Sequence, residues 1–523
     1  MEIQPPAIQI RDLVATQLHN EAPLKPESDD NKTALFQKKQ KKRKHHQHHS
    51  VSSLEKPRRH EKLFEVIGWS MAEQLRNFPN IVALDSICET THSIEYRPLD
   101  TSSLTFFSTS SKTLVGEHPT FPSSGYTSSK ESVCKSNVPD MSVQPRGAAP
   151  YRHALSKCPD AGTVLTIDEF ATIPALESLL VRYGSVSHMG ILDKSYRFFI
   201  NGTRTAALYF KVQGHVAIVG GDPLCESTQY GALLAEFARY RKHFRWKLAF
   251  MGATDSFAQY AKAKGWTILE FGTERVLNPL TNSILFEKRG KRILTQVRKL
   301  LSEAKTGITL GVYAPSQGED PELQRELNDL YDTWRRERNR TDAVQAFITV
   351  YEVFSLPRFM VYIYSRGPDG RILGFAALRK IGADRGYHID PCIAAKDSPK
   401  GITDLLVFST MALLNQAGIS FLSLGYEPLS EIGSISGMPR VLVDITKSVY
   451  RHIFHHLHME GKKKYHDKWQ PDENQGSNLY LIFPSSIPGP RHITAILHMA
   501  NIRIRKVVFS HSRSKEMNET KKI

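Results

Sequence analysis

Cations and aromatic rings alternate in one short stretch near the carboxyl end of the sequence, GKKKYHDKWQP (461–471). Lys463 and Lys468 stand there among further lysines, with Tyr465 and Trp469 between them. Ammonium groups pair with phosphates, and aromatic faces stack on unpaired bases at about 1–3 kcal/mol per base. The pattern therefore favours binding of unpaired nucleic acid, and a solvated basic helix is the alternative interpretation.

A second basic stretch, KRGKRILTQVRK (288–299), is expected to be helical. Arg292 and Arg298 lie six positions apart in it, so they point from different faces of the helix. At least one of them is expected to reach a phosphate.

Motifs for nucleophilic or metal chemistry are missing from the sequence. No Ser/His/Asp order and no Cys/His pair is recognisable, and the His-rich run YRHIFHHLH (450–458) has the spacing of an amphipathic helix. The five cysteines lie far apart without a CxxC pair, which predicts neither disulfides nor zinc and suits a reducing compartment.

The formal charge of +16 is concentrated in the later part of the chain. Residues 1–150 contribute +2 and residues 151–523 contribute +14. A polyanion such as nucleic acid or an acidic lipid surface is the expected partner. The sequence contains neither a secretory signal nor about 18 consecutive apolar residues, so we expect a cytoplasmic protein that meets membranes peripherally.

A strand-and-helix plan occurs twice, around residues 196–266 and again around 359–424. The first copy is predicted to contain strands at 197–200, 204–212 and 215–221, a helix at 228–244 and a strand from Trp246. Asn201-Gly202 predicts a two-residue hairpin turn, with Gly supplying a positive φ. The second copy is predicted to contain strands at 359–365, 371–381 and 386–394, a helix at 401–418 and a strand at 419–425. Such a repeat indicates a duplicated domain, with two unrelated hairpin–helix units as the alternative.

This layout, with a short helix ending in Lys264-Gly265-Trp266, is that of the acetyltransferase-like (GNAT-like) fold. We therefore expect an α+β protein with two such folds in tandem, at 151–308 and, as the catalytic one, 309–505. Residues 1–150 are expected to be a mostly disordered, basic and Ser-rich extension containing one helix over 62–78, and 506–523 a polar tail. The basic block at 38–49 is typical of either a localisation or nucleic-acid patch or a solvated tail.

One loop argues against the most common donor of that fold. Most members bind coenzyme A through a Gly-rich loop at a helix N-terminus, where bare amides and the helix dipole hold the pyrophosphate. The corresponding loop in the second copy, AKDSPKGITD (395–404), has one glycine instead of a pair. We therefore expect no coenzyme A.

Six segments, taken in order, resemble the C-terminal catalytic domain of bacterial phosphatidylglycerol lysyltransferases and their relatives. They are VGGDPL (219–224), Glu274 after KGWTILEFG, KRGKRILTQVRK (288–299), IDPCIAAKDSPKGITDLLVF (389–408), LGYEPLSEIG (424–433) and GKKKYHDKWQP (461–471). The resemblance covers roughly 160–485 and implies transfer of an aminoacyl group from a charged tRNA to a lipid hydroxyl, without metal or cofactor.

A departure from the family pattern bears on the acceptor. The family's Asp-Leu-Met-Arg element reads Asp390-Pro391-Cys392-Ile393, so Ile393 replaces an arginine that suits a headgroup phosphate. The Ser-rich extension and the lack of a synthetase portion are similar to the fungal branch, whose members esterify the 3β-hydroxyl of ergosterol. The resemblance thus implies glycyl-tRNA as donor, membrane ergosterol as acceptor and a glycyl-tRNA synthetase as a further partner. A phosphatidylglycerol acceptor, a non-catalytic RNA- or membrane-binding adaptor and a coenzyme A-dependent acetyltransferase are the alternatives.

The resemblance also implies residue roles. Acyl transfer between oxygens needs a proton relay, donors for the developing oxyanion and cations for the tRNA backbone. Asp390 is expected to be the relay or to hold the α-ammonium group, a structural carboxylate being the alternative, and Glu274 is the second catalytic candidate. Ile393 and Asp222 are expected at the substrate pocket, Asp222 more structural than catalytic. The expected tRNA-binding residues are Arg292, Arg298, Lys463 and Lys468.

Overall fold

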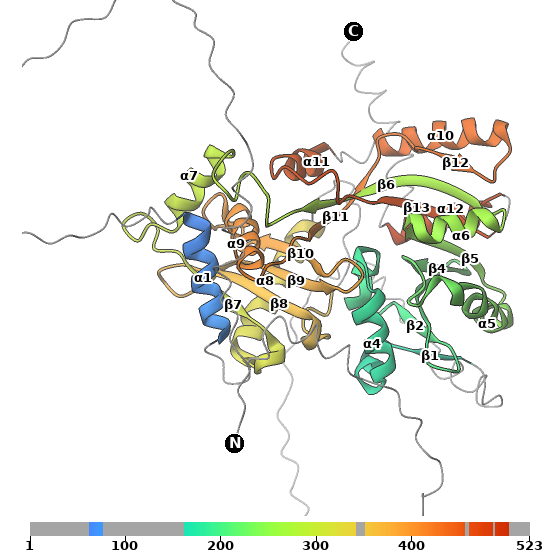
Figure 1. The fold of residues 1–523 in the computed structure, drawn as a ribbon, viewed down its shortest axis with the longest axis horizontal. Helices are drawn as coiled ribbons and strands as arrows, with labels where there is room; N and C mark the ends of the chain where they lie inside the picture. The colour runs from blue at the N-terminus through green and yellow to red at the C-terminus, as the bar shows by residue number, and fades with distance from the viewer. Residues whose placement is uncertain (1–61, 77–161, 341–350, 456–459, 485–486, 501–523) are drawn as a thin grey trace, which may run out of the picture. The chain divides into compact units, whose positions relative to one another are not determined.

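The computed structural model describes residues 62–76, 162–340, 351–455, 460–484 and 487–500 (Figure 1). The helix predicted over 62–78 is confirmed as α1 (Leu63–Arg76). The remainder of the 1–150 extension, its basic block and the expected tail at 506–523 lie outside the described residues.

The first copy follows the predicted order of elements. A short strand, β1 (Thr163–Leu165), the helix α4 (Pro174–Tyr183) and the 3-10 turn η2 (Val186–Leu192) precede it. Its elements are β2 (Arg197–Ile200), β3 (Ala207–Gln213), β4 (Val216–Gly220), α5 (Tyr230–His243), β5 (Lys247–Ala253), α6 (Asp255–Ala263) and β6 (Thr267–Leu277).

The turn between β2 and β3 differs from the prediction. The connection spans residues 201–206, closed by a hydrogen bond from the Asn201 amide to the Ala206 carbonyl at 3.0 Å. The residue with positive φ is Arg204, at 59°, not Gly202. The Asn201 side chain explains the longer loop, because its Oδ1 accepts the amides of Thr205 and Ala206 and so replaces a tight backbone turn.

The second copy repeats the plan, which confirms the duplication. It contains β8 (Met360–Arg366), β9 (Ile372–Ile381), β10 (Gly386–Ala394), α9 (Ile402–Gln416) and β11 (Leu422–Pro428). Between the copies lie α7 (Lys291–Leu300), β7 (Thr309–Tyr313) and α8 (Pro321–Asn339), whose N-cap Asp320 accepts the Leu323 amide. After them come β12 (Ile435–Ser436), α10 (Arg440–His455), α11 (Glu460–Asp467), β13 (Asn478–Phe483) and α12 (Pro490–Met499).

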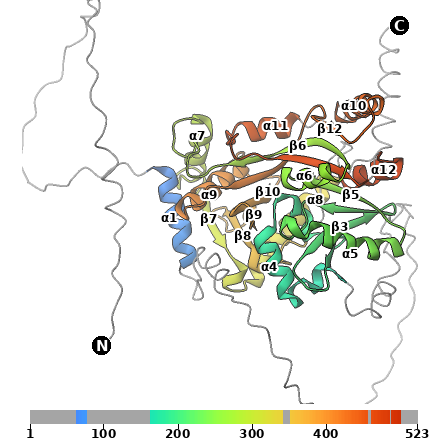
Figure 2. The same ribbon diagram turned by 45° about the vertical axis from the view of Figure 1, so that its right-hand side comes forward.

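The strands of the described residues form one 13-stranded sheet in which the copies exchange strands. Its order is β1-β2-β3-β4-β5-β13-β6-β11-β10-β9-β8-β7, with β12 paired to β6. The late strand β13 (red) therefore lies between β5 and β6 (green), and β6 pairs with β11 of the second copy (Figures 1 and 2). The division expected at residue 308 falls between α7 and β7, and ladder pairs connect the segments on its two sides.

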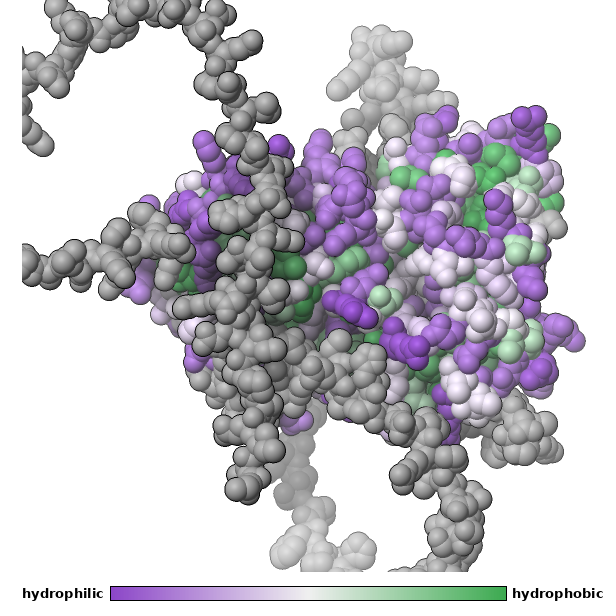
Figure 3. All heavy atoms as spheres, in the orientation of Figure 1, coloured by the Kyte–Doolittle hydropathy of each residue, from purple (hydrophilic) through white to green (hydrophobic). Residues whose placement is uncertain are grey.

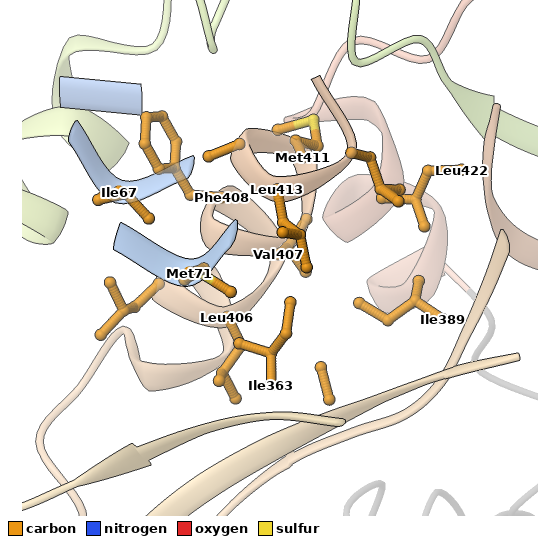
Figure 4. Close-up of a cluster of buried hydrophobic side chains, with 14 of the residues drawn as sticks. Ile67, Met71, Ile363, Ile389, Leu406, Val407, Phe408, Met411, Leu413 and Leu422 are labelled. Atoms are coloured by element: carbon orange, nitrogen blue, oxygen red, sulfur yellow. The ribbon is translucent and has the colours of Figure 1, made fainter. Parts of the chain in front are cut away.

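The two faces of the second copy's strands pack differently. On one face, Ile389 and Leu378 join α9, α1 and α7 in an apolar cluster; Figure 4 shows Ile67 and Met71 of α1 against α9. On the other face, alternate residues such as Phe375 and Ile393 pack against α4 and η2 of the first copy. This face of β9 and β10 therefore forms part of the packed contact between the two copies.

Candidate functional site

The strands of the second copy separate where those of the first stay paired. β4 and β5 are paired in parallel over five positions, whereas β10 and β11 pair only at Tyr387↔Leu422 and His388↔Ser423. The ladder between β10 and β9 is also interrupted between Ile389 and Cys392. Asp390 therefore stands at the point where the sheet opens.

Asp390 lies in a partly buried, hydrogen-bonded position. The Tyr351 hydroxyl donates to its Oδ2 at 2.5 Å. Burial raises the pKa of Asp390, while the Tyr351 hydrogen bond and the positive charges of Lys462 and Arg379 act in the opposite direction. The carboxyl group is thus surrounded by groups that can hold its anion, in a residue that is only partly buried.

A row of polar residues crosses the sheet beside Asp390. Arg379 on β9 lies opposite His388 on β10, and His388 lies opposite Ser423 on β11. Residues directly opposite one another point to the same face. Arg379 and His388 are each 2% exposed, so the row is enclosed by protein.

Arg379 and His388 both keep unused hydrogen-bonding capacity. Arg379 Nη2 donates to the Ser185 carbonyl at 3.3 Å, but Nη1 has no partner among the described residues. Burial and, to a smaller extent, the positive charge of Arg379 lower the pKa of His388 to about 3, so its ring is neutral near pH 7. Because Nδ1 faces the Ser423 carbonyl at 3.2 Å and must donate to it, Nε2 is an unpaired acceptor in the same part of the structure.

Glu274 approaches the same row from β6. It is 5% exposed, lies opposite Tyr426 on β11, and accepts a hydrogen bond from Ser477 Oγ at 3.2 Å. Burial raises its pKa to about 7, opposed by serine hydrogen bonds and by Arg379. Arg379 is therefore an electrostatic neighbour of both expected catalytic residues, Glu274 and Asp390.

Asp222 has a different environment, in the first copy. Its carboxylate accepts the Thr254 amide at 2.8 Å and the Thr254 hydroxyl at 2.6 Å, just before α6. Burial raises its pKa to about 6, and the Thr254 hydrogen bonds oppose this. Its carbonyl faces Nε2 of the buried His188 at 3.2 Å. Asp222 thus joins β4, α6 and η2.

Ile393 lies in the apolar cluster between the copies. It is 2% exposed and lies opposite Phe375 on β9. Three residues beyond Asp390, its side chain therefore adds an apolar, uncharged group to this cluster.

The lysines of the 461–471 motif form internal ion pairs. Lys463 Nζ lies 3.0 Å from Glu427, which also faces His466 Nδ1 at 3.3 Å, although the Lys463 side chain remains 60% exposed. Lys468 pairs with Asp404 and lies 3.9 Å from the centre of the Tyr465 ring.

Two neighbours in this motif differ from what the sequence indicated. Trp469 is fully buried in the apolar cluster formed with α9, α1 and α7. The expectation that it stacks on a base is therefore wrong, because its ring packs in the protein core. Lys462, by contrast, faces inward as an electrostatic neighbour of Asp390 and Glu427, and burial lowers its pKa.

α7 carries an exposed basic surface. Ile293, Leu294 and Val297 bury one face of the helix. Arg292 and Arg298 lie on the exposed side, and Arg298 pairs with Glu287 at 2.5 Å. The exposed cations of this segment are Lys288, Arg289, Lys291, Arg292, Arg298 and Lys299.

The sequence did not point to Arg379, His388 or Tyr351, and Lys462 was expected only as one of the lysines of the 461–471 basic cluster. A usable signal existed for two of them, since Arg379 and His388 are polar residues at inward positions of otherwise apolar strands, ILGFAALRKI and GYHIDPCIA. Within the described ranges, no group of three or more His, Cys, Asp or Glu side chains is arranged to hold a metal ion. Among the helices described, none is long and apolar enough to span a bilayer.

The family model and the similar proteins all point to the same family. Residues 177–481, more than half of the chain, match the family described as "Phosphatidylglycerol lysyltransferase, C-terminal". A lysylphosphatidylglycerol biosynthesis bifunctional protein LysX of Rhodococcus opacus is 25% identical over 306 residues, which are 57% of this chain and 26% of that protein. A phosphatidylglycerol lysyltransferase of Staphylococcus xylosus is 21% identical over 57% of this chain and 35% of that protein.

A solved structure supports the fold. The structure of L-PGS from Bacillus licheniformis covers 64% of this chain and 97% of its own, with 21% identity and a TM-score of 0.50. The chain spans about a quarter to a third of the length of the two curated relatives described above.

Proposed function

The chain belongs to the phosphatidylglycerol lysyltransferase C-terminal family, and on that premise we propose that it transfers an aminoacyl group from a charged tRNA to a lipid hydroxyl. The observation that carries the proposal is the buried row at the opening of the second copy. There an arginine N–H and a neutral imidazole nitrogen, both without partners among the described residues, accompany two carboxyl groups with raised pKa values. Perturbed carboxyl groups beside unpaired polar atoms are typical of active sites.

Asp390 is the first choice for the proton relay. In the proposed step, the lipid hydroxyl oxygen attacks the carbonyl carbon of the aminoacyl ester while Asp390 accepts the hydroxyl proton. The bond from the carbonyl carbon to the tRNA ribose oxygen then breaks, and the proton passes to that oxygen. Asp390 is favoured because it is the more accessible of the two carboxyl groups, and a raised pKa suits acid–base exchange.

Arg379 is proposed to stabilise the charge that develops on the carbonyl oxygen. Its Nη1 can donate one hydrogen bond from a buried position, where such donors lower a barrier most effectively. His388 Nε2 can accept a hydrogen bond from the α-ammonium group of the donor. Glu274 is the second candidate for proton transfer, because a pKa of about 7 lets it exchange protons near neutrality.

The tRNA is proposed to lie across α7 and the 461–471 motif. Arg292, Arg298 and Lys463 keep exposed side chains in these segments, which suits phosphate contacts. Lys468 is included on the basis of the family motif, although it already pairs with Asp404. No coenzyme is required by this scheme, since the charged tRNA supplies the activated ester.

As the specific reaction we propose transfer of glycine from glycyl-tRNA to the 3β-hydroxyl of ergosterol at a membrane surface. Support comes from the apolar side chain of Ile393 in place of a phosphate-binding arginine. Transfer to phosphatidylglycerol is the second candidate, favoured by the names of the two relatives described above.

Lipid analysis tests the proposal. The wild-type chain and its Asp390→Asn variant are expressed in a fungal host that contains both lipids, and lipid extracts are compared by mass spectrometry. We expect a lipid that carries one added aminoacyl group only with the wild type. The fragment masses identify the amino acid and the acceptor, and a wild-type extract without such a lipid would count against the proposal.

A further inference from the structure

An apolar cavity of about 320 Å³ lies beneath α10, outside the polar row. The sheet provides its floor through residues such as Met251 on β5, Phe271 on β6 and Leu481 on β13. The helices provide its cover, for example through Leu442 of α10 and Ile496 of α12. A cavity of this size is within the range of small-molecule sites.

The wall of the cavity offers almost no polar group to a ligand. No charged residue lines it among the described residues, and only Thr446 and Tyr450 carry hydroxyl groups. The Tyr450 hydroxyl already lies 2.7 Å from the Leu429 carbonyl and 3.2 Å from the Phe271 carbonyl. A phosphate or an amine would lose its hydration here without compensation, so the wall suits hydrocarbon.

The cavity has an apolar mouth, formed by Ile445, Val449, Ile487 and Ile493, which line it and are also exposed. Ile445 is 54% exposed and Ile487 is 52% exposed. Figure 3 shows hydrophobic surface (green) in the region of α10. Clustered apolar side chains of this kind indicate a surface that is covered in use.

Basic residues accompany the mouth on the same helix. Arg440 and Arg451 are exposed near the two ends of α10, and Arg451 also pairs with Glu431 at 3.0 Å. Lys447 and the exposed Asp444 lie between them, so the Lys, Arg and Asp residues of the helix give a net positive charge. Val441, one turn before Ile445, is 72% exposed. An amphipathic helix with apolar residues on one side and cations beside them is the pattern of helices that lie in a membrane interface. The charge and the apolar mouth together favour an anionic bilayer over a soluble protein as the source of the occupant.

The inner wall of the cavity is continuous with the strands of the polar site. The Phe271 ring lines the cavity and meets the Tyr426 ring edge-on, with 6.3 Å between centroids. Tyr426 lies opposite Glu274 in the β6–β11 ladder. Pro428, two residues after Tyr426, also lines the cavity.

We propose that this cavity binds the hydrocarbon body of the acceptor lipid, which enters from a bilayer through the mouth. That the bound lipid is the acceptor rests on the proposed function. Binding of the lipid itself needs neither tRNA nor turnover. Both a sterol ring system and an acyl chain present the hydrocarbon that the wall suits, and the experiment separates them.

The test measures equilibrium binding to the full chain without tRNA. The two probes are an intrinsically fluorescent sterol and a phosphatidylglycerol with a fluorescent acyl chain, each presented in vesicles. Thr446→Trp fills the cavity from α10, and Ser448→Trp places the same side chain on an exposed, non-lining position of that helix. We expect Thr446→Trp to weaken binding of the preferred probe by at least about tenfold and Ser448→Trp to change it by less than about twofold.

Equal weakening by both variants, or no specific binding of either probe by the wild type, overturns the proposal; the second result fits a mouth covered by the chain's own residues or by another protein. The preferred probe identifies a ring system or an acyl chain. Unchanged melting temperature and tRNA binding verify that Thr446→Trp is folded. Probe binding by the wild-type chain without any aminoacyl transfer would contradict the proposed function and leave this inference standing.

Discussion

Arg379 and His388 lie directly opposite each other on β9 and β10, and each keeps one buried nitrogen without a partner among the described residues. An unsatisfied buried polar atom costs about 1–3 kcal/mol. Two such atoms on the same face, one a donor and one an acceptor, are explained if a substrate supplies the missing partners. The relationship therefore links the fold to acyl transfer, which needs both.

Arg379→Lys tests the oxyanion role, because lysine keeps the charge but loses the planar donor fork. We expect kcat for aminoacyl transfer to fall by about 10²–10³, with a smaller change in KM. Arg371→Lys is the matched control, since Arg371 is exposed and pairs with Asp397. Near-normal kcat in an Arg379→Lys protein with unchanged melting temperature would remove Arg379 from the mechanism.

Asp390→Asn tests the proton relay. We expect turnover to fall by at least about a hundredfold, because the amide accepts no proton, while the fold survives. Melting curves are measured beside the rates, because a destabilised variant would imitate a catalytic one. If a stable Asp390→Asn protein turns over normally, the relay is not Asp390, and Glu274 becomes the residue to test.

Glu274→Gln tests the electrostatics of the row through stability. The pKa of Glu274 is about 7 in the folded chain against an ordinary 4.5, so between these values the folded state holds a proton that the unfolded state has lost. The free energy of unfolding therefore falls as the pH rises from 4.5 to 7. The glutamine does not titrate, so the stability of the variant does not share this fall. The free energy of unfolding of Glu274→Gln, relative to that of the wild type, should therefore rise by on the order of 3 kcal/mol between pH 5 and pH 8. A constant difference in free energy of unfolding across this range would show that burial does not perturb Glu274.

Salt dependence tests the tRNA surface. Arg292→Ala and Lys463→Ala should each weaken tRNA binding and reduce the slope of log affinity against log salt by about 1, because each lost phosphate contact releases one counterion fewer. Arg298→Ala and Lys468→Ala are measured with them, since both side chains also hold internal ion pairs. Arg182→Ala, whose partner is Glu226 in the first copy, is the control. Slopes unchanged in all four variants would place the tRNA elsewhere.

The sequence predicts much of the fold because its information is local. Alternation and turn residues identify the strand 386–394 correctly, and helical spacing places α9 within two residues at each end. The insertion of β13 between β5 and β6 was not predictable, because pairing between strands far apart in the chain leaves no local pattern.

The candidate site was predictable only in part. The family motif drew attention to Asp390 and Glu274, which the structure brings together around Arg379. Tyr351 gave no signal, since its contact with Asp390 depends on how a loop packs on the sheet. The burial of Trp469 was missed because a basic motif gives no indication of which side of its helix meets the core.

The most direct test of the central claim is transfer by the purified chain from radiolabelled glycyl-tRNA to lipid vesicles. Vesicles contain ergosterol, phosphatidylglycerol or neither, and parallel reactions receive ribonuclease or coenzyme A. We predict a lipid-extractable labelled ester that forms with ergosterol, is lost after ribonuclease treatment and needs no coenzyme A. Label in phosphatidylglycerol alone would contradict the acceptor assignment, and product that forms equally after ribonuclease treatment would contradict tRNA-dependent transfer itself.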